Sequence, residues 1–279
     1  MHAERCALVL STSQQHLFIV PRMSNQLQIQ QVRHVLVRLE ETIIFALIER
    51  AQFLRNAIVY ETGRFGAMLE GQSLCGFMLL ECERSHAKVR RYTSPDEHPF
   101  FENLPAPILP PIGYGHNPLV SNHININDTI RQTYETSILN RITQPGDDEQ
   151  YGSTAVCDVA CLQALSKRIH YGKFVAESKY RAASPGLQQA ITNTSSQDIM
   201  EAITDIDVEQ KVLDRVYHKA RTYTNELLQT SSKWTLQPEV IRDIYKDFII
   251  PLNKQVQVEY ILLRKQQVPL DTTKLTSAS

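Results

Sequence analysis

The sequence predicts an all-α protein, built on a bundle of long helices and folded as one domain. Over several long stretches, apolar residues recur at intervals of three and four, which is the period of one face of an α-helix. We find no run of alternating β-branched residues with turn residues between strands. The chain has 279 residues, 42% of them hydrophobic, which suffices for a sizeable core.

The first half of the sequence predicts three helices and one connector. A long amphipathic helix is expected over 27–55 and a second over about 72–92, after which Pro95 excludes a continuing helix. Residues 103–123 are rich in proline and predict extended chain over the surface. Helical periodicity returns at 127–142.

The second half predicts further helices, several of them long. One is expected over 153–181, and shorter helical pieces follow at 185–203. A single apolar stripe marks 206–229 as a helix, and another marks 237–266. Pro251 lies inside the last of these and is expected to bend it.

The charge balance excludes some classes of partner. The 29 basic and 30 acidic residues give a net charge of −1. Such a chain has no field over its whole surface that attracts nucleic acid or an anionic membrane, so we expect neither as a partner. No apolar run approaches the ~20 residues that span a bilayer.

The ends of the chain and its cysteines bear on its compartment. The apolar patches near the N-terminus are interrupted by polar residues, unlike those of a signal peptide. We expect residues 1–25 to be a disordered extension, 26–268 a single domain and 269–279 a flexible tail of a cytoplasmic protein. Cys157 and Cys161 lack a second Cys/His pair for zinc. We therefore expect free thiols, which suit a reducing compartment, and no metal.

Polar side chains fall where the inward faces of the helices are expected. Arg168 and Lys179 lie about three turns plus 20° apart, so a continuous helix puts both on one face with about 16 Å between their Cα atoms. Three cations against few carboxylates would leave buried positive charge uncompensated, and a small dianionic ligand would compensate it. The alternative is a set of scattered interhelical salt bridges. The other members of the set are Arg33, Asp205, Glu209, Asn253 and Gln257.

Four stretches of the sequence carry a family resemblance. They are LVRLEETIIFALIERAQF, VRRYTSPDEHPFF, YGSTAVCDVACLQALSKRIHYGKFVAESKY and IYKDFIIPLNKQVQVEYILLR. Together they resemble the fungal and plant branch of the all-helical chorismate mutases, over roughly 29–268. The resemblance implies a cytosolic isomerase without cofactor, which converts chorismate to prephenate on the route to phenylalanine and tyrosine.

The resemblance implies a role for each polar residue of the set. Arg33 and Arg168 would pair with the substrate carboxylates, which also fixes the substrate's orientation. Lys179 would contact a carboxylate and the ether oxygen. The ring hydroxyl would be bound by Glu209 and by the backbone near Asp205.

Two residues of the last helix depart from the fungal pattern. Fungal members have Thr where this chain has Asn253, and Glu where it has Gln257. That Glu must be protonated to donate a hydrogen bond to the ether oxygen, whereas an amide donates at any pH. We therefore expect activity at neutral to mildly alkaline pH. The alternative is a catalytically weak or dead paralogue that acts as a dimeric effector-binding protein.

The resemblance also implies regulation, with tyrosine as inhibitor and tryptophan as activator at a site between the subunits of a homodimer. A helix N-terminus and arginine side chains both bind an amino-acid carboxylate. Gln237 replaces a Thr that the family associates with switching between active and inactive states. The matching effector residues are Arg90, Arg91, Gln150, Gly152, Ser153 and Val156, of which Gln150 and Val156 differ from the usual Asn and Thr.

Overall fold

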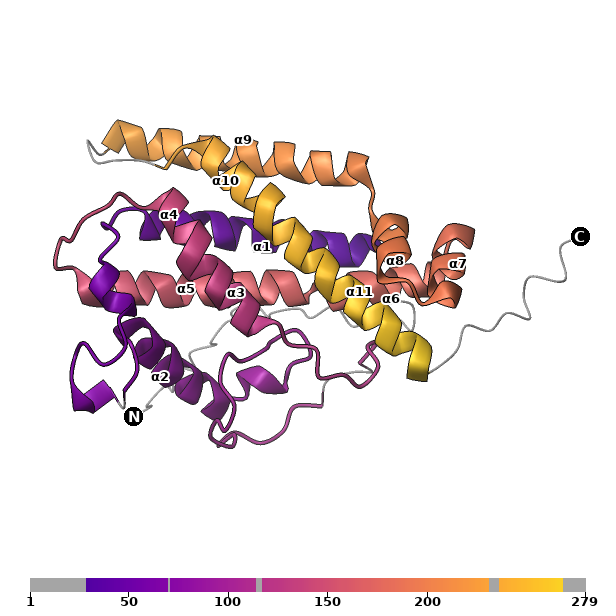
Figure 1. Ribbon diagram of the computed structural model, residues 1–279, viewed down its shortest axis with the longest axis horizontal. Coiled ribbons are helices and arrows are strands. Elements are labelled where there is room, and N and C mark those ends of the chain that lie inside the picture. The colour runs from indigo at the N-terminus through magenta and orange to yellow at the C-terminus, as the bar shows by residue number, and fades with distance from the viewer. Residues whose placement is uncertain (1–28, 70, 114–116, 231–235, 268–279) are drawn as a thin grey trace, which may run out of the picture.

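The prediction of an all-α fold is confirmed. The computed structural model describes residues 29–69, 71–113, 117–230 and 236–267, and within these ranges the chain forms helices and connecting segments and no strand. The predicted terminal segments, 1–25 and 269–279, lie outside the described residues. In Figure 1, α1 (Ile29–Arg50), α5 (Tyr151–His170) and α9 (Ile206–Thr230) lie roughly side by side. The unit formed by α10 (Pro238–Ile244) and α11 (Ile250–Gln267) crosses them diagonally.

The first helix, α1 (Ile29–Arg50), ends before the predicted boundary at 55. The cause is the side chain of Arg50, because its guanidinium donates to the carbonyl oxygens of Phe53, Leu54 and Arg55 at 3.1–3.2 Å. The chain therefore folds back around its own last helical residue.

A buried carboxylate fixes the connector that follows α2 (Leu74–Lys88). Glu83 of α2 is fully buried, and it accepts the N–H groups of Phe100 and Phe101 at 2.9–3.1 Å. It also accepts the side-chain amide of Gln163, on α5, at 2.9 Å. One side chain thus ties α2, the connector and α5 together.

A buried lysine holds the far end of the same connector. The Lys173 ammonium donates to His98 Nε2, to Asn122 Oδ1 and to the Ile124 carbonyl at 2.6–3.0 Å. All three acceptors are neutral, and burial lowers the pKa of Lys173 to about 8. Its three donors are satisfied without a carboxylate.

Two π-helical turns interrupt predicted helices. The helix expected over 127–142 consists of α3 (Asn127–Thr133), a π turn and α4 (Leu139–Ile142). The last predicted helix consists of α10 (Pro238–Ile244), a π turn at Tyr245–Ile249 and α11 (Ile250–Gln267). Pro251 is the second residue after that π turn, so its missing N–H falls where the i→i−4 ladder is already interrupted.

The long helix predicted over 153–181 is divided into α5 (Tyr151–His170) and α6 (Gly172–Ala182). α11 lies very close to this division, since a Cβ atom on Gly172 would lie 2.8 Å from the Asn253 side chain and backbone. At this short distance the Asn253 side-chain amide donates a hydrogen bond to the carbonyl of Ile169 at 2.9 Å. Glycine at 172 therefore permits the contact between the helices.

Two short helices with serine N-caps and one long helix follow α6. Ser184 accepts an N–H at the start of α7 (Pro185–Asn193), and Ser195 does so for α8 (Ser196–Ile203). The long α9 (Ile206–Thr230) follows. It packs on α1, where Arg215 donates two bonds of 2.7–2.8 Å to the buried Glu40.

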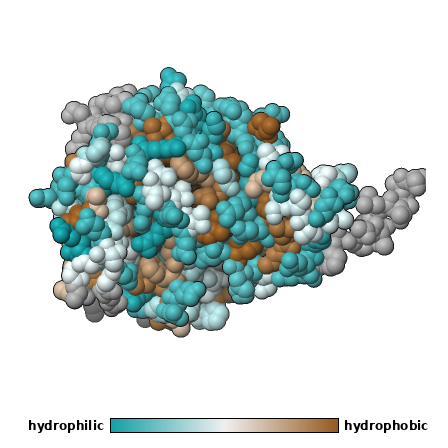
Figure 2. All heavy atoms as spheres, viewed as in Figure 1, coloured by the Kyte–Doolittle hydropathy of each residue, from teal (hydrophilic) through white to brown (hydrophobic). Residues whose placement is uncertain are grey.

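The apolar core forms two clusters, one around α1, α5 and the π turns and one around α6, α7 and α8. Figure 2 shows polar and apolar residues interspersed over the visible face, without a broad apolar area. Among the described helices, none combines the length and apolar character that crossing a membrane requires.

A saturated ion pair is buried beside the first cluster. Arg50 and Asp158 are fully buried and joined at 2.7 Å. Asp158 also accepts the hydroxyl groups of Tyr60 and Tyr134, each at 2.7 Å. Every oxygen of the carboxylate is therefore engaged, which is the condition under which a buried pair is tolerated.

Removing the Asp158 carboxylate would leave the Arg50 guanidinium buried and uncompensated. We expect Asp158→Ala to lower the free energy of unfolding by about 3–5 kcal/mol, as measured by urea denaturation. Asp247→Ala is the matched control, because Asp247 pairs with Arg141 on the surface. Its expected loss is below about 1 kcal/mol. Equal losses in the two variants would contradict the importance given to the buried pair.

Candidate active site

The side chain of Arg168, in the last turn of α5, is buried without a counter-ion contact. The residue is 5% exposed, and its Nε and Nη1 atoms have no hydrogen-bond partner among the residues that the structure describes. Burial lowers its pKa, while the nearby Tyr245 and Glu40 act in the opposite direction. A guanidinium in this state is ready to bind an anion, since ligand oxygens would satisfy the donors that the protein leaves unpaired.

Lys179, on α6, presents a second cation. Its ammonium donates to the Ile203 carbonyl at 2.6 Å and to Gln257 Oε1 at 3.1 Å. An ammonium has three donors, so one remains for a ligand. Burial lowers the pKa of Lys179 to about 8, so the ammonium loses its charge around pH 8.

Hydrogen bonds set the orientation of the Gln257 amide. Lys179 can only donate, so the oxygen of Gln257 must face it, and Gln257 Nε2 in turn donates to Asn253 Oδ1 at 2.9 Å. Asn253 is fixed by its own bond to the Ile169 carbonyl. Gln257 and Asn253 are 4% and 7% exposed. The second Nε2 hydrogen of Gln257 is thus held in place for a ligand acceptor.

Two carboxylates from the start of α9 border the Lys179 site. Asp205 caps the helix by accepting the N–H of Val208 at 3.0 Å. Glu209 pairs with Lys254 at 2.9 Å. Both carboxylates lie close enough to Lys179 to favour its charged form.

Arg33 differs from the expectation that it faces the bundle interior, because the structure places it in an exposed position. The buried position is taken by its neighbour Val32, which is 1% exposed, and one residue along a helix turns the side chain by about 100°. Arg33 still lies close enough to Lys179 to disfavour its charged form.

Sequence reasoning missed three charged residues around the site. Glu40 and its partner Arg215 lie beside Arg168, and Lys254 lies beside Glu209. The sequence pattern gave little indication of them, because the apolar stripes do not distinguish these three residues from ordinary surface charges. The alternative of interhelical salt bridges thus describes these pairs, while Arg168 itself has no such partner among the described residues.

The predicted effector residues fall into two groups that one chain does not bring together. Arg91 contacts Glu97 at 3.0 Å, and Glu97 also binds Lys167, near the C-terminal end of α5. Gln150, Gly152, Ser153 and Val156 lie at the opposite end of that helix. Lys167 and Ser153 are about 21 Å apart along the axis.

The structure also describes the state of Arg90, Val156 and Gln237. Arg90 has a positive φ of 70°, donates to the Pro110 carbonyl and keeps its Nε buried without a partner among the described residues. Val156 is 55% exposed. Gln237 directly precedes α10.

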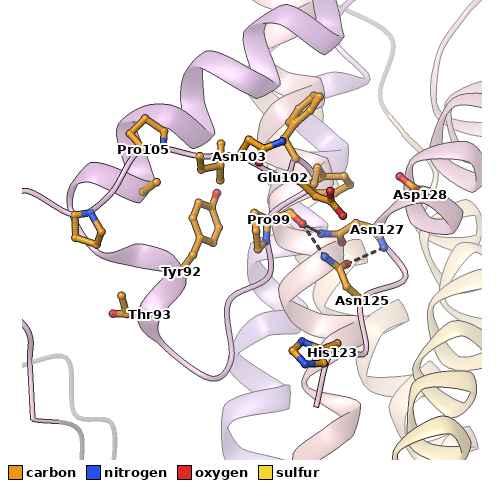
Figure 3. Close-up of a pocket in the computed structure, with 15 residues that line it drawn as sticks. Tyr92, Thr93, Pro99, Glu102, Asn103, Pro105, His123, Asn125, Asn127 and Asp128 are labelled. Carbon is orange, nitrogen blue, oxygen red and sulfur yellow. Dashed lines mark hydrogen bonds between the residues drawn. The ribbon is translucent and has the colours of Figure 1, made fainter. Parts of the chain in front are cut away.

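A pocket of about 570 Å³ opens at the end of α2, and none of the predicted site residues lines it. Figure 3 shows Tyr92 on one side of it and Asn125 and Asn127 on the other, with both amides bonded to the Pro99 carbonyl. Its lining includes Glu102 and Asp128, and its only basic residue is His123. This pocket does not suit a dianion. In the described part of the chain, no cluster of three His, Cys, Asp or Glu residues is arranged to hold a metal ion.

Sequence comparisons identify relatives with one activity. A family model described as chorismate mutase type II matches residues 150–258. The chorismate mutase of Schizosaccharomyces pombe is 43% identical over 247 residues, which are 87% of this chain and 98% of that protein. Chloroplastic chorismate mutase 1 of Petunia hybrida is 45% identical over 242 residues, which are 84% of this chain and 74% of that protein.

Solved structures agree with these relatives. Aro7p chorismate mutase from Candida albicans, in complex with L-Trp, superimposes with a TM-score of 0.80 at 39% identity and covers 89% of this chain and 96% of its own. AtCM1 with tyrosine bound in its allosteric site gives a TM-score of 0.77 at 43% identity, covering 85% of this chain and 96% of its own.

The unpaired state of Arg168 predicts a gain in stability on its removal. We expect Arg168→Met to raise the free energy of unfolding by about 1–3 kcal/mol without ligand, because a buried charge is replaced by an apolar chain of similar length. Urea denaturation measures the change. Arg33→Met, at an exposed position, is the control and is expected to stay within about 0.5 kcal/mol. A less stable Arg168→Met protein would mean that the guanidinium is satisfied by the fold.

Proposed function

This chain belongs to the eukaryotic chorismate mutase family, and from that premise we propose how its residues act on the substrate. The enzyme is an isomerase that rearranges chorismate to prephenate. In this reaction one C–O bond breaks as one C–C bond forms within a single molecule. It needs no nucleophile, metal or cofactor. The protein has to hold the enolpyruvyl side chain over the ring and to stabilise negative charge that develops on the ether oxygen.

The unpaired guanidinium of Arg168 is the observation that best supports this assignment. Chorismate is a dianion, and its carboxylates would satisfy donors that have no partner in the part of the chain that the structure describes. In our proposal Arg168 binds one carboxylate, and Arg33 closes from the surface onto the other. Glu209 accepts the ring hydroxyl, and Asp205 holds the backbone around it by capping α9.

Lys179 and Gln257 would act on the ether oxygen. Each has one donor left after its contacts within the protein. Donors already aligned before charge develops cost no reorganisation during the reaction, and each such donor is worth about 10²–10³ in rate. Asn253 contributes by orienting Gln257.

We also propose the finer assignments that the family suggests. The chain would act as one domain over 26–268 in the cytoplasm, at the branch to phenylalanine and tyrosine, as a homodimer with effector sites between subunits. The separation of the two effector groups on one chain supports such sharing, since a second copy could bring the missing half. Tyrosine and tryptophan would bind there through Arg90, Arg91 and the N-terminus of α5, at Gln150, Gly152, Ser153 and Val156.

The wild-type pH profile is the first test of this mechanism. Chorismate disappearance should proceed at pH 5–7 without a requirement for protonation of residue 257, because an amide does not titrate. The value of kcat/KM should fall above pH 8, because Lys179 has a pKa of about 8 in the free enzyme and loses its charge there. Absence of turnover by folded protein at every pH would refute the enzymatic function and favour the effector-binding paralogue.

A carboxyl group at position 257 should make the enzyme dependent on acid. We expect Gln257→Glu to lower kcat/KM by about 10²-fold at pH 7.5, with recovery as the pH falls and the carboxyl becomes a donor. Gln257→Met is the matched control, since its loss should not depend on pH. A flat profile for Gln257→Glu would show that residue 257 does not donate to the reacting oxygen.

The effector site predicts a loss of binding on removal of the arginine pair. The double variant Arg90→Ala/Arg91→Ala should bind tyrosine and tryptophan at least about tenfold more weakly in calorimetry, because the carboxylate loses its cationic partners. Arg84→Ala is the control, since Arg84 lies on the preceding helix, α2, and pairs with Glu81 among the described residues. Sedimentation velocity tests the dimer, and a monomer that binds tyrosine with wild-type affinity would contradict a shared site.

A further inference from the structure

We propose that Lys254, on α11, is a positioning residue that holds the Glu209 carboxylate away from Lys179 and so keeps the Lys179 ammonium available to the substrate. The inference rests on the proposed function of the site, in which Lys179 and Glu209 bind different parts of chorismate. Lys254 itself touches no substrate atom in this account.

The contacts of Lys254 place it between the end of α8 and the start of α9. Its ammonium lies 2.9 Å from Glu209 Oε1 and 3.4 Å from Thr204 Oγ1. The side chains of Lys254 and Glu209 are 20% and 29% exposed, so the pair is partly shielded from water. Thr204 adjoins Ile203, whose carbonyl accepts the bond from Lys179. One lysine thus ties Glu209 to the turn that also positions Lys179.

The charges around Lys179 explain why such a tie is needed. Asp205 and Glu209 face it from the start and first turns of α9, Arg33 faces it from α1, and Lys254 faces it from α11. The two carboxylates favour the charged ammonium, and the two cations oppose them. Its direct partners are neutral, namely the Ile203 carbonyl and Gln257.

Without Lys254, the Glu209 carboxylate would have one obvious new partner. The ammonium of Lys179 keeps one donor that its contacts in the described part of the chain do not use. A carboxylate that occupied this donor would compete with the ether oxygen of the substrate for the same cation. It would also withdraw Glu209 from the ring hydroxyl. Lys254 prevents both effects by offering Glu209 a different cation, which is also bonded to Thr204.

The direct measurement is the pKa of Lys179, followed by NMR of labelled lysine side chains in the full-length protein. In Lys254→Met we expect this pKa to rise by about half to one unit, because one cation is lost and Glu209 moves closer. In the Glu209→Gln background, adding Lys254→Met should raise the Lys179 pKa clearly less than it does in the wild-type background, since only the lost cation contributes. The difference between the two backgrounds isolates the part that acts through Glu209.

Kinetics give a second readout. Lys254→Met should raise KM for chorismate about two- to fivefold, the range that a partly exposed ion pair accounts for, and shift the alkaline limb of kcat/KM to higher pH. Lys254→Arg should restore both values. Lys265→Met is the control on the same helix, because Lys265 binds only Thr192 and Thr194 among the described residues, and it should change neither.

The outcomes separate this inference from the proposed function. If the Lys179 pKa does not rise in Lys254→Met, or rises equally with and without Glu209, then Lys254 does not position Glu209 and the inference is overturned. A change in thermal stability alone would also overturn it. If wild-type protein turns over no chorismate, the proposed function fails, while the NMR titration still decides whether Lys254 controls the Lys179–Glu209 contact.

Discussion

The guanidinium of Arg168, buried at the end of α5 with two nitrogens that lack a partner among the described residues, is the constraint on which the arrangement of this end of the bundle depends. A buried charge without a partner costs several kcal/mol, so the fold must be stable enough to carry it. The structure shows how that end is fixed. α5 stops at His170, Gly172 lets α11 approach, and Asn253 binds a carbonyl at the break between the helices. The same Asn253 then orients Gln257 toward Lys179.

The comparison between Arg50 and Arg168 shows what distinguishes a buried cation with a full set of acceptors from one that lacks them. Both side chains are buried: Arg168 belongs to α5, and Arg50 contacts Asp158 of the same helix. Arg50 donates to Asp158, to a tyrosine hydroxyl and to three backbone carbonyls, so it has nothing left to offer a ligand. Arg168 has two nitrogens without acceptors in the described chain, and its nearest carboxylate, Glu40, is already bound by Arg215. Arg50 therefore uses its donors to hold the fold together, whereas Arg168 retains donors that an anion could satisfy.

The same comparison applies to Lys173 and Lys179, whose acceptors are neutral groups. Lys173 is saturated by a histidine, an amide and a carbonyl, and it serves to anchor the connector. Lys179 has two such partners among the described residues, which leaves one of its three donors unused there. The pKa of each is lowered to about 8 by burial, so the number of occupied donors, and not the pKa, separates the anchor from the binding group.

The sequence by itself determined the helical class, the order of the helices and the family, because apolar periodicity and the RIHYGKFVAE stretch are local properties of the chain. It also placed Arg168, Lys179 and Gln257 in the set of site residues. Tertiary structure alone decided the state of each side chain. Arg33 is exposed because Val32 occupies the core position, α1 ends early because Arg50 binds the carbonyls that follow it, and Glu209 faces a lysine that no stripe singled out. These outcomes depend on which partners distant helices bring within hydrogen-bond distance, and helical periodicity carries no information about that.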